Sequence, residues 1–290
     1  MSTSMTSSST GPAPGPGTGS VPAPGPSHDY ESGPGRRSRF RPATLLTLLS
    51  LTGLTVGSMI HLKVSPGQVL ASLPAFFRFI AENTWPPDFS GPADLAMATL
   101  VTVEVAFLGT LAATIISLPL ALLAARNLTP HPVVYAGVRS LVMVCRAVPD
   151  FVFALMFVAA LGLGPLPGVL GLAIHSVGML GKVYAERIEE IDPGPAEALS
   201  AVGGRELQVV RLAVLPEVVP SLVANTLYRF DINIRSSIIL GIVGAGGIGY
   251  ELVTALQSLA YERAAAVMVV VLVLVVVVEA MSNQIRKRYL

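Results

Sequence analysis

The sequence predicts an all-α membrane protein with six transmembrane helices, and three observations support that prediction. The 290-residue chain is 52% hydrophobic and only 13% charged, whereas a soluble domain is about 25% charged. Long stretches without Asp, Glu, Lys or Arg recur along the chain, and basic residues gather just outside the first and the last of them. The formal net charge of +1 supplies no basic field for nucleic acid, so none is expected as a partner.

Residues 1–41 precede these stretches and differ from them in composition. Ser, Thr, Gly and Pro dominate most of this segment, and aliphatic residues are almost absent. Such a segment buries too little apolar surface to offset the entropy lost on ordering. We predict a disordered cytoplasmic tail, and the pattern of a secretory signal peptide is not present in it.

The first two spans are predicted from length and lack of charge. Residues 43–62 are uncharged and long enough to cross about 30 Å of hydrocarbon. Residues 42–93 are therefore predicted to form a first transmembrane helix and an outer loop, and residues 94–290 a core with five further spans. The second span is residues 105–125, which include Pro119, a residue that membrane helices tolerate.

The third and fourth spans are predicted to form a tight hairpin. Residues 151–181 carry no formal charge, but they are too few for two crossings and a turn. The sequence "GLGPLPG" at residues 162–168 marks the turn. The third span therefore begins before Phe151 and includes Arg146 and Asp150, four residues apart on one helix, near its start.

The fifth and sixth spans are residues 218–241, interrupted by Arg229, Asp231 and Arg235, and residues 264–281. Six spans place both termini on the same side of the membrane. Basic residues are enriched in cytoplasmic segments, so both termini are predicted to be cytoplasmic, in the cell membrane. The basic residues that flank the outermost spans are Arg36, Arg37, Arg39, Arg41, Arg286, Lys287 and Arg288.

A polar loop at about 188–216 separates the fourth and fifth spans. Pro195 suits the start of a helix and Glu197 its positively polarised first turn, while Gly203 and Gly204 break the helix. An apolar stripe at helical spacing then predicts a second, amphipathic helix, which Pro216 ends or kinks. That stripe consists of Leu207, Val210 and Val214.

The stretch "EALSAVGGRELQVVRLAVLP" in this loop resembles the EAA loop of permease subunits in ATP-binding-cassette (ABC) importers. Five residues match the usual pattern in register, while Leu199 replaces its second alanine and Ala213 its isoleucine. The matching residues are Glu197, Ala198, Gly203, Leu215 and Pro216. The resemblance implies that these residues, together with Gly204, couple the chain to an ATPase.

Residues 146–186 and 228–252 resemble the permeases of phosphonate and related phosphorus-oxyanion importers. This resemblance implies a type I ABC-importer permease fold and transport by alternating access. It also implies a second permease copy as a homodimer, a cytoplasmic ATPase dimer that binds ATP, and an extracytoplasmic substrate-binding protein. The chain itself would hold no cofactor and no catalytic residue. Which phosphorus oxyanion is carried, and whether a homologous chain replaces the second copy, stay open.

A polar stripe along the fifth span is the predicted translocation path. Ser221, Asn225, Arg229, Asn233 and Ser236 are spaced by four, four, four and three residues, which places them on one helix face. Polar groups inside a span usually face a water-filled cavity or each other, and Arg suits a phosphoryl oxygen. Arg146 is a further candidate on the path, with an intrahelical pair to Asp150 as the alternative. Asp231 and Arg235 are also four residues apart, and a structural pair between them is favoured over contact with substrate, which stays open as the alternative.

Three other features weigh against other classes of protein. Gly244, Gly246 and Gly249 have the spacing of a dinucleotide-binding loop, but a membrane span precedes them, so we interpret them as a bend that forms part of an outer gate. The four histidines and the single Cys145 show no metal-ligand spacing, so no metal site is expected. An ion-coupled secondary transporter of a small anion remains the alternative function, although no internal repeat supports it.

Overall fold

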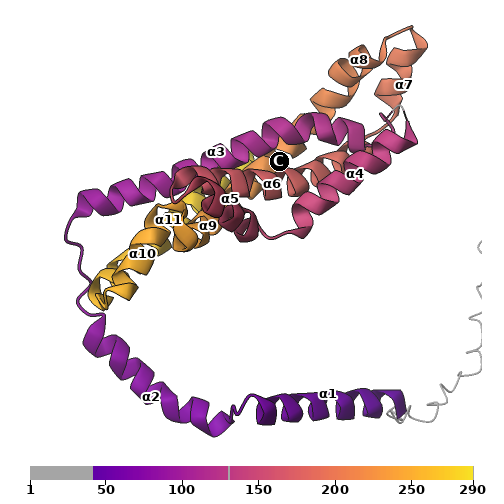
Figure 1. Cartoon of the computed structure of the whole chain (residues 1–290). Coiled ribbons are helices and arrows are strands. Elements are labelled where there is room, and N and C mark those ends of the chain that lie inside the picture. Colours follow the sequence, from indigo (N-terminus) through magenta and orange to yellow (C-terminus); the bar gives the residue numbers. More distant parts are fainter. Residues whose placement is uncertain (1–41, 130, 290) are drawn as a thin grey trace, which may run out of the picture. The chain divides into compact units, whose positions relative to one another are not determined.

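The computed structural model describes residues 42–129 and 131–289, so the predicted tail at 1–41 lies outside the described residues. The described residues divide into two compact units, with the boundary between residues 68 and 69. Every regular element in the described part of the chain is helical (Figure 1). These elements are α1 (Pro42–His61), α2 (Pro66–Asn83), α3 (Pro92–Ala124), α4 (Pro132–Ala147), α5 (Asp150–Leu161), α6 (Pro165–Glu189), α7 (Gly194–Ala201), α8 (Glu206–Val209), a π-helical turn (Val210–Val214), α9 (Leu215–Leu240), a second π-helical turn (Gly241–Ala245), α10 (Ile248–Gln257) and α11 (Tyr261–Tyr289).

Within residues 42–129 and 131–289, five helical segments are long and apolar enough to cross a membrane, and the bent pair α4 and α5 makes a sixth if it counts as one span. The five are α1, α3, α6, the continuous segment 206–245, and α11. This agrees with the six predicted spans. The predicted outer loop contains a helix, α2, which begins at Pro66. Proline is favoured at a first helical position because its fixed φ suits the helix and the missing N–H is not needed there.

The core of the 69–290 unit is built on close contact between α3 and α6, with small residues where the helices touch. A Cβ atom at Gly109 of α3 would lie 2.8 Å from the Cβ of Leu172, and one at Gly171 would lie 2.8 Å from the backbone nitrogen of Ala154 on α5. Membrane helices gain stability from such contacts because lipid supplies no hydrophobic drive between them. Glycine at these positions therefore sets the spacing of the bundle.

The third span differs from its prediction as one straight helix. It consists of α4 and α5, which meet at an angle of 83°. Pro149 disfavours helical geometry in the residue before it, and Val148 is extended, with φ −90° and ψ 126°. Arg146 therefore lies in the last turn of α4 and Asp150 opens α5, so the alternative of an intrahelical pair between them is wrong.

The helix after Gly204 also differs from its prediction, because it continues into the fifth span. Pro216 was expected to end or kink this helix, yet it is the second residue of α9. The ring of a proline clashes with the carbonyl four residues earlier and donates no hydrogen bond. The π-helical turn just before it widens the backbone, with the N–H of Leu215 donating to the carbonyl of Val210. One helical rod therefore runs from the loop into the membrane.

The glycine-rich segment after α9 forms a tight turn. Gly244, Gly246 and Gly247 have φ of 103°, 76° and 73°, which residues with a Cβ rarely adopt. The N–H of Gly164, in the turn between α5 and α6, donates to the carbonyl of Gly244 at 3.0 Å. Helices lie on both sides of this turn, so the parallel sheet of a dinucleotide-binding fold does not surround it.

Candidate functional site

A buried polar network joins α3, α6 and α9 in the middle of the bundle. The Asn233 amide nitrogen donates to Thr110 Oγ1 at 2.8 Å and to Ser176 Oγ at 3.0 Å. Arg229 Nε donates to the same Ser176 oxygen at 2.9 Å. All four residues are buried. In a low-dielectric interior such bonds must nearly all be made, so the network fixes how the three helices pack.

Arg229 is the charged member of this network, and its side chain is not fully satisfied. The residue is 5% exposed. Its Nη2 atom has no hydrogen-bond partner among the residues that the structure describes. The Asp150 carboxylate interacts electrostatically with the Arg229 guanidinium, but these two side chains form no ion pair within 4 Å among the described residues. A buried guanidinium with an unused donor is costly, and an anion that reached it would remove that cost.

The predicted stripe is only partly brought together. Asn225 donates to the carbonyl of Ser221 at 2.8 Å, on the turn of α9 nearer the loop. Ser236 is half-buried, and its side chain makes no hydrogen bond among the described residues. Arg146 ends α4 and is exposed. These four residues share no hydrogen bond with the network around Arg229.

Two members of the network, Ser176 and Thr110, were not predicted from the sequence. They lie on α6 and α3, far from Arg229 in sequence. Serine and threonine are common in membrane helices because their hydroxyls can bond to a carbonyl of the preceding turn, as Thr110 does to Ala106. The sequence indicated these two residues only by a hydroxyl within an uncharged span, which is weak evidence for a role in a polar network.

A second polar group links α9 to α11. Arg235 Nη2 lies 3.1 Å from Asp231 Oδ2 and 3.3 Å from Glu279 Oε2. The predicted pairing of Asp231 with Arg235 is confirmed, and Glu279 joins it from the last helix. His175 on α6 is one of the four histidines, and its Nδ1 lies 2.9 Å from the carbonyl oxygen of Val148. Because a carbonyl only accepts, Nδ1 carries the hydrogen. In the described parts of the chain, no cluster of side chains has the make-up of a metal site.

The predicted coupling loop projects as a helical hairpin at one end of the bundle (Figure 1). Gly203 turns the chain between α7 and α8 with φ 88°. A Cβ at Gly204 would lie 2.8 Å from the carbonyl oxygen of Leu199, so this position also requires glycine. Val202 and Leu207 are 80% and 78% exposed at the tip. Two apolar side chains this exposed fit a contact with another protein.

The predicted coupling residues occupy different parts of this hairpin. Glu197 lines a groove of about 730 Å³ between α7 and the bundle, together with Asn127 and Leu128 from the end of α3. Ala198 is exposed on α7, and Leu215 and Pro216 lie at the start of α9. Within the predicted apolar stripe, Val214 is buried while Leu207 is exposed, so the stripe does not form one buried face.

Membrane-length helices packed around a buried arginine, with a helical hairpin projecting from one end, define a membrane transport subunit. The model of the family described as "Binding-protein-dependent transport system inner membrane component" matches residues 117–290. The chain belongs to this family, which confirms the membership predicted from the loop.

Two curated relatives come from phosphorus-oxyanion transport systems. The phosphate-import permease protein PhnE of Mycolicibacterium smegmatis is 50% identical over 202 residues, which cover 70% of this chain and 38% of that protein. The phosphite transport system permease protein PtxC of Stutzerimonas stutzeri is 42% identical over 221 residues, which cover 76% of this chain and 80% of that protein. The match thus spans well under half of the mycobacterial relative and most of the other.

Solved structures confirm the fold. A chain of the MetNI methionine ABC transporter in an inward-facing conformation is 22% identical, with a TM-score of 0.59, covering 69% of this chain and 99% of that one. A chain of an amino acid ABC transporter with histidines is 19% identical, with a TM-score of 0.57, covering 69% of this chain and 98% of that one. At these identities the likeness concerns the fold alone, and the fold is the predicted type I ABC-importer permease.

Proposed function

We propose that this chain is the membrane-spanning subunit of an ATP-driven importer of a phosphorus oxyanion, with phosphonate, phosphite and phosphate as candidate substrates. Family membership and the names of the two relatives support the transport role and the substrate class. The chain contributes no bond-making chemistry of its own. Partner subunits bind and hydrolyse ATP, and an extracytoplasmic binding protein delivers the substrate.

The single observation that supports this proposal most directly is the unused donor of Arg229. Its Nη2 is buried and has no partner among the described residues, while Nε is held by Ser176. Arginine is suited to phosphoryl oxygens because its donors form a planar fork and its charge is permanent. The guanidinium is therefore oriented in advance, with one donor left for an anion that enters between α6 and α9.

Coupling to the ATPase would act through the helical rod. Val202 and Leu207 at the loop tip seat on the ATPase, and the rod that begins at Glu206 carries Arg229. Arg229 lies 22 positions after Leu207, which corresponds to about 33 Å along the helix axis at a rise of 1.5 Å per residue. Movement of the tip on ATP binding thus shifts α9 against α6, which opens or closes the network to the anion.

The remaining parts of the assembly belong to the same proposal. A second copy of this chain completes the path, both termini face the cytoplasm, and the glycine turn at 244–247 forms part of the outer gate. The hydrogen bond between Gly164 and Gly244 supports that gate, because it ties two turns that must separate when the outer end opens.

The test is uptake by proteoliposomes that contain this chain with its ATPase and its binding protein, supplied with phosphonate, phosphite and phosphate in turn. Uptake should require ATP and both partners. Arg229→Gln should lower uptake roughly tenfold to a hundredfold, the range for losing a hydrogen bond to a charged group. Arg78→Gln, an exposed arginine on α2 without a hydrogen bond or ion pair among the described residues, is the matched control.

Two outcomes would overturn the proposal. Uptake by this chain alone, driven by an ion gradient, would make it a secondary transporter. Equal uptake by the Arg229 and Arg78 variants would remove Arg229 from the path, provided that both assemble with the ATPase to the same extent.

A further inference from the structure

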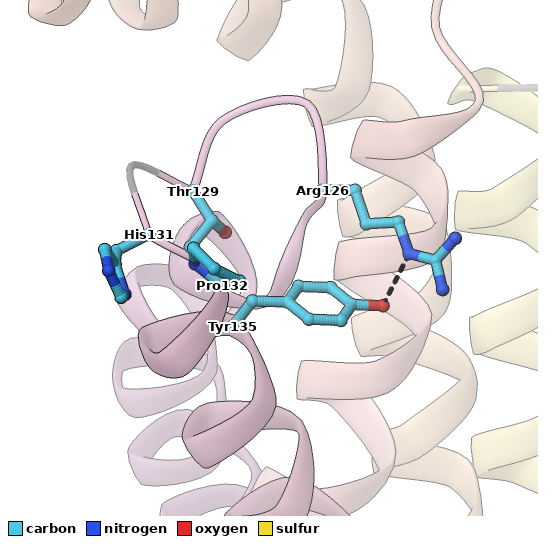
Figure 2. Close-up of a pocket in the computed structure, with 5 residues that line it drawn as sticks. All are labelled: Arg126, Thr129, His131, Pro132 and Tyr135. Atoms are coloured by element: carbon cyan, nitrogen blue, oxygen red, sulfur yellow. Dashed lines mark hydrogen bonds between the residues drawn. The ribbon is translucent and has the colours of Figure 1, made fainter.

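A small cavity of about 250 Å³ lies where α3 ends and α4 begins, away from the transport network. It is lined by Arg126, Thr129, His131, Pro132 and Tyr135. Figure 2 shows the Arg126 side chain reaching the hydroxyl of Tyr135, with His131 at the other side of the group. Nothing in the proposed transport cycle uses these side chains.

The hydrogen bonds of this group leave several donors free. Arg126 Nε donates to the Tyr135 hydroxyl oxygen at 2.9 Å, and its two Nη atoms make no hydrogen bond among the described residues. His131 Nδ1 accepts from the backbone N–H of Val133 at 3.2 Å. The hydrogen of a neutral imidazole must then be on Nε2, which becomes a donor. The His131 imidazole lies on the far side of the group from the Arg126 guanidinium (Figure 2), so the free arginine fork is the part that suits an anion with several oxygens.

The local charges leave a net positive charge at the cavity. Arg139 forms an ion pair with Glu189 at 2.8 Å, which satisfies the nearest carboxylate. Arg126 is in no ion pair within 4 Å among the described residues, and its bond to Tyr135 raises the pKa of the guanidinium above its usual range. The Cζ atoms of Arg126 and Arg139 lie 5.4 Å and 5.2 Å from the centroid of the Tyr135 ring. The ring thus holds the Arg126 guanidinium in place.

The position of the cavity indicates where such an anion comes from. Arg126 follows directly on the membrane-length helix α3, and its neighbours Asn127 and Leu128 line the groove beneath the projecting hairpin. The cavity therefore lies at the membrane surface from which the hairpin projects. The face of α4 that leads away from it is apolar and exposed, with Val133 71% exposed and Val134, Leu141 and Val144 exposed as well. A polar site for a lipid headgroup thus adjoins an apolar surface for the acyl chains of the same lipid.

We propose that Arg126, oriented by Tyr135, binds the phosphate of an anionic phospholipid, whose acyl chains lie along α4. The free Nη donors of Arg126 hold the phosphate oxygens, and the Tyr135 hydroxyl orients the guanidinium. Because Asn127 donates to the carbonyl of Ile188 at the end of α6, a bound lipid would also steady the segment beneath the coupling hairpin. This inference does not depend on which substrate the importer carries.

The experiment is native mass spectrometry of the full chain in detergent, with phosphatidylglycerol or phosphatidylcholine added in turn. The wild-type protein should retain phosphatidylglycerol in preference to phosphatidylcholine. Arg126→Gln should lower phosphatidylglycerol retention about tenfold, the scale of one lost charge-assisted hydrogen bond. Arg126→Lys should retain part of the binding, and Tyr135→Phe, which loses only the orienting hydroxyl, should weaken it less than Arg126→Gln does.

The matched control is Arg187→Gln, an exposed arginine at the same end of the bundle that is paired with Glu190 at 2.8 Å. This variant should retain the lipid like the wild-type chain. Equal retention by the Arg126 and Arg187 variants, or no preference for phosphatidylglycerol in the wild type, would overturn the proposal. Inorganic phosphate at millimolar concentration is the second arm: saturable phosphate binding lost in Arg126→Gln, without lipid retention, would overturn the lipid assignment in favour of a free oxyanion.

Discussion

Ser176 is the residue whose removal tests the buried network most sharply. Its hydroxyl oxygen accepts from Arg229 Nε at 2.9 Å and from the Asn233 amide at 3.0 Å. Ser176→Ala removes that acceptor while adding no bulk, so two buried donors lose a partner. Asn233 keeps its bond to Thr110, whereas Arg229 loses its only hydrogen bond to a side chain among the described residues.

The expected cost follows from these bonds. An unsatisfied buried donor costs about 1–3 kcal/mol, and more if it is charged. Interhelical hydrogen bonds in membranes average only about 0.6 kcal/mol in double-mutant cycles, because the unfolded chain also finds partners. Since Arg229 accounts for most of the loss, we expect Ser176→Ala to lower the free energy of unfolding by about 2–4 kcal/mol.

The assay is unfolding by sodium dodecyl sulfate in mixed micelles, followed by circular dichroism. Ser282→Ala is the matched control, because Ser282 on α11 is also buried but makes one long bond of 3.4 Å to the carbonyl of Leu227. Its loss should cost less than about 1 kcal/mol. If the two variants unfold at the same detergent concentration, the network around Arg229 does not stabilise the bundle and the reasoning fails.

Three further predictions concern other parts of the chain. Gly204→Ala should reduce ATP-driven uptake more than it reduces helix content, because the new Cβ would lie 2.8 Å from the carbonyl of Leu199; uptake equal to wild type would contradict this. Glu279→Gln should change the free energy of unfolding in mixed micelles by less than about 1 kcal/mol, because this carboxylate and Arg235 are both about half exposed; a larger loss would show a desolvated pair. Asp88, in the loop before α3, accepts hydrogen bonds from the backbone and side chain of a neighbouring serine, which hold the pKa of its carboxyl below the usual range. Its stabilising contribution should be present above the unfolded pKa of about 3.9 and lost as the pH falls through the lower folded value, so the difference in melting temperature between wild type and Asp88→Asn should shrink below about pH 4.

Several structural features followed from local rules that the sequence displays. The spans follow from uncharged length, and the position of Arg229 and Asn233 on one face of α9 follows from their separation of four residues. The bend between α4 and α5 also follows from a local rule, because Pro149 disfavours a helical Val148, although a single helix was predicted there. The pairing of Asp231 with Arg235 is another local i, i+4 relation.

The contacts between helices could not be predicted from the sequence alone. Nothing in the chain alone pairs Arg229 with Ser176, or Asn233 with Thr110, since these partners meet only once α3, α6 and α9 pack together. The same holds for Glu279 on α11, which meets Arg235 only because α9 and α11 pack together. The exposure of Val202 and Leu207 likewise depends on how the hairpin leaves the bundle.

The sequence by itself thus determined the membrane environment, the number of spans and the residue types available for an anion, because composition and periodicity act within single helices. The tertiary structure alone decided which of those polar residues meet and which donor of Arg229 stays free. The physical reason is that the apolar length of a membrane helix depends only on its own residues. The partner of a buried polar group depends instead on how closely neighbouring helices approach, which glycines such as Gly109 and Gly171 control.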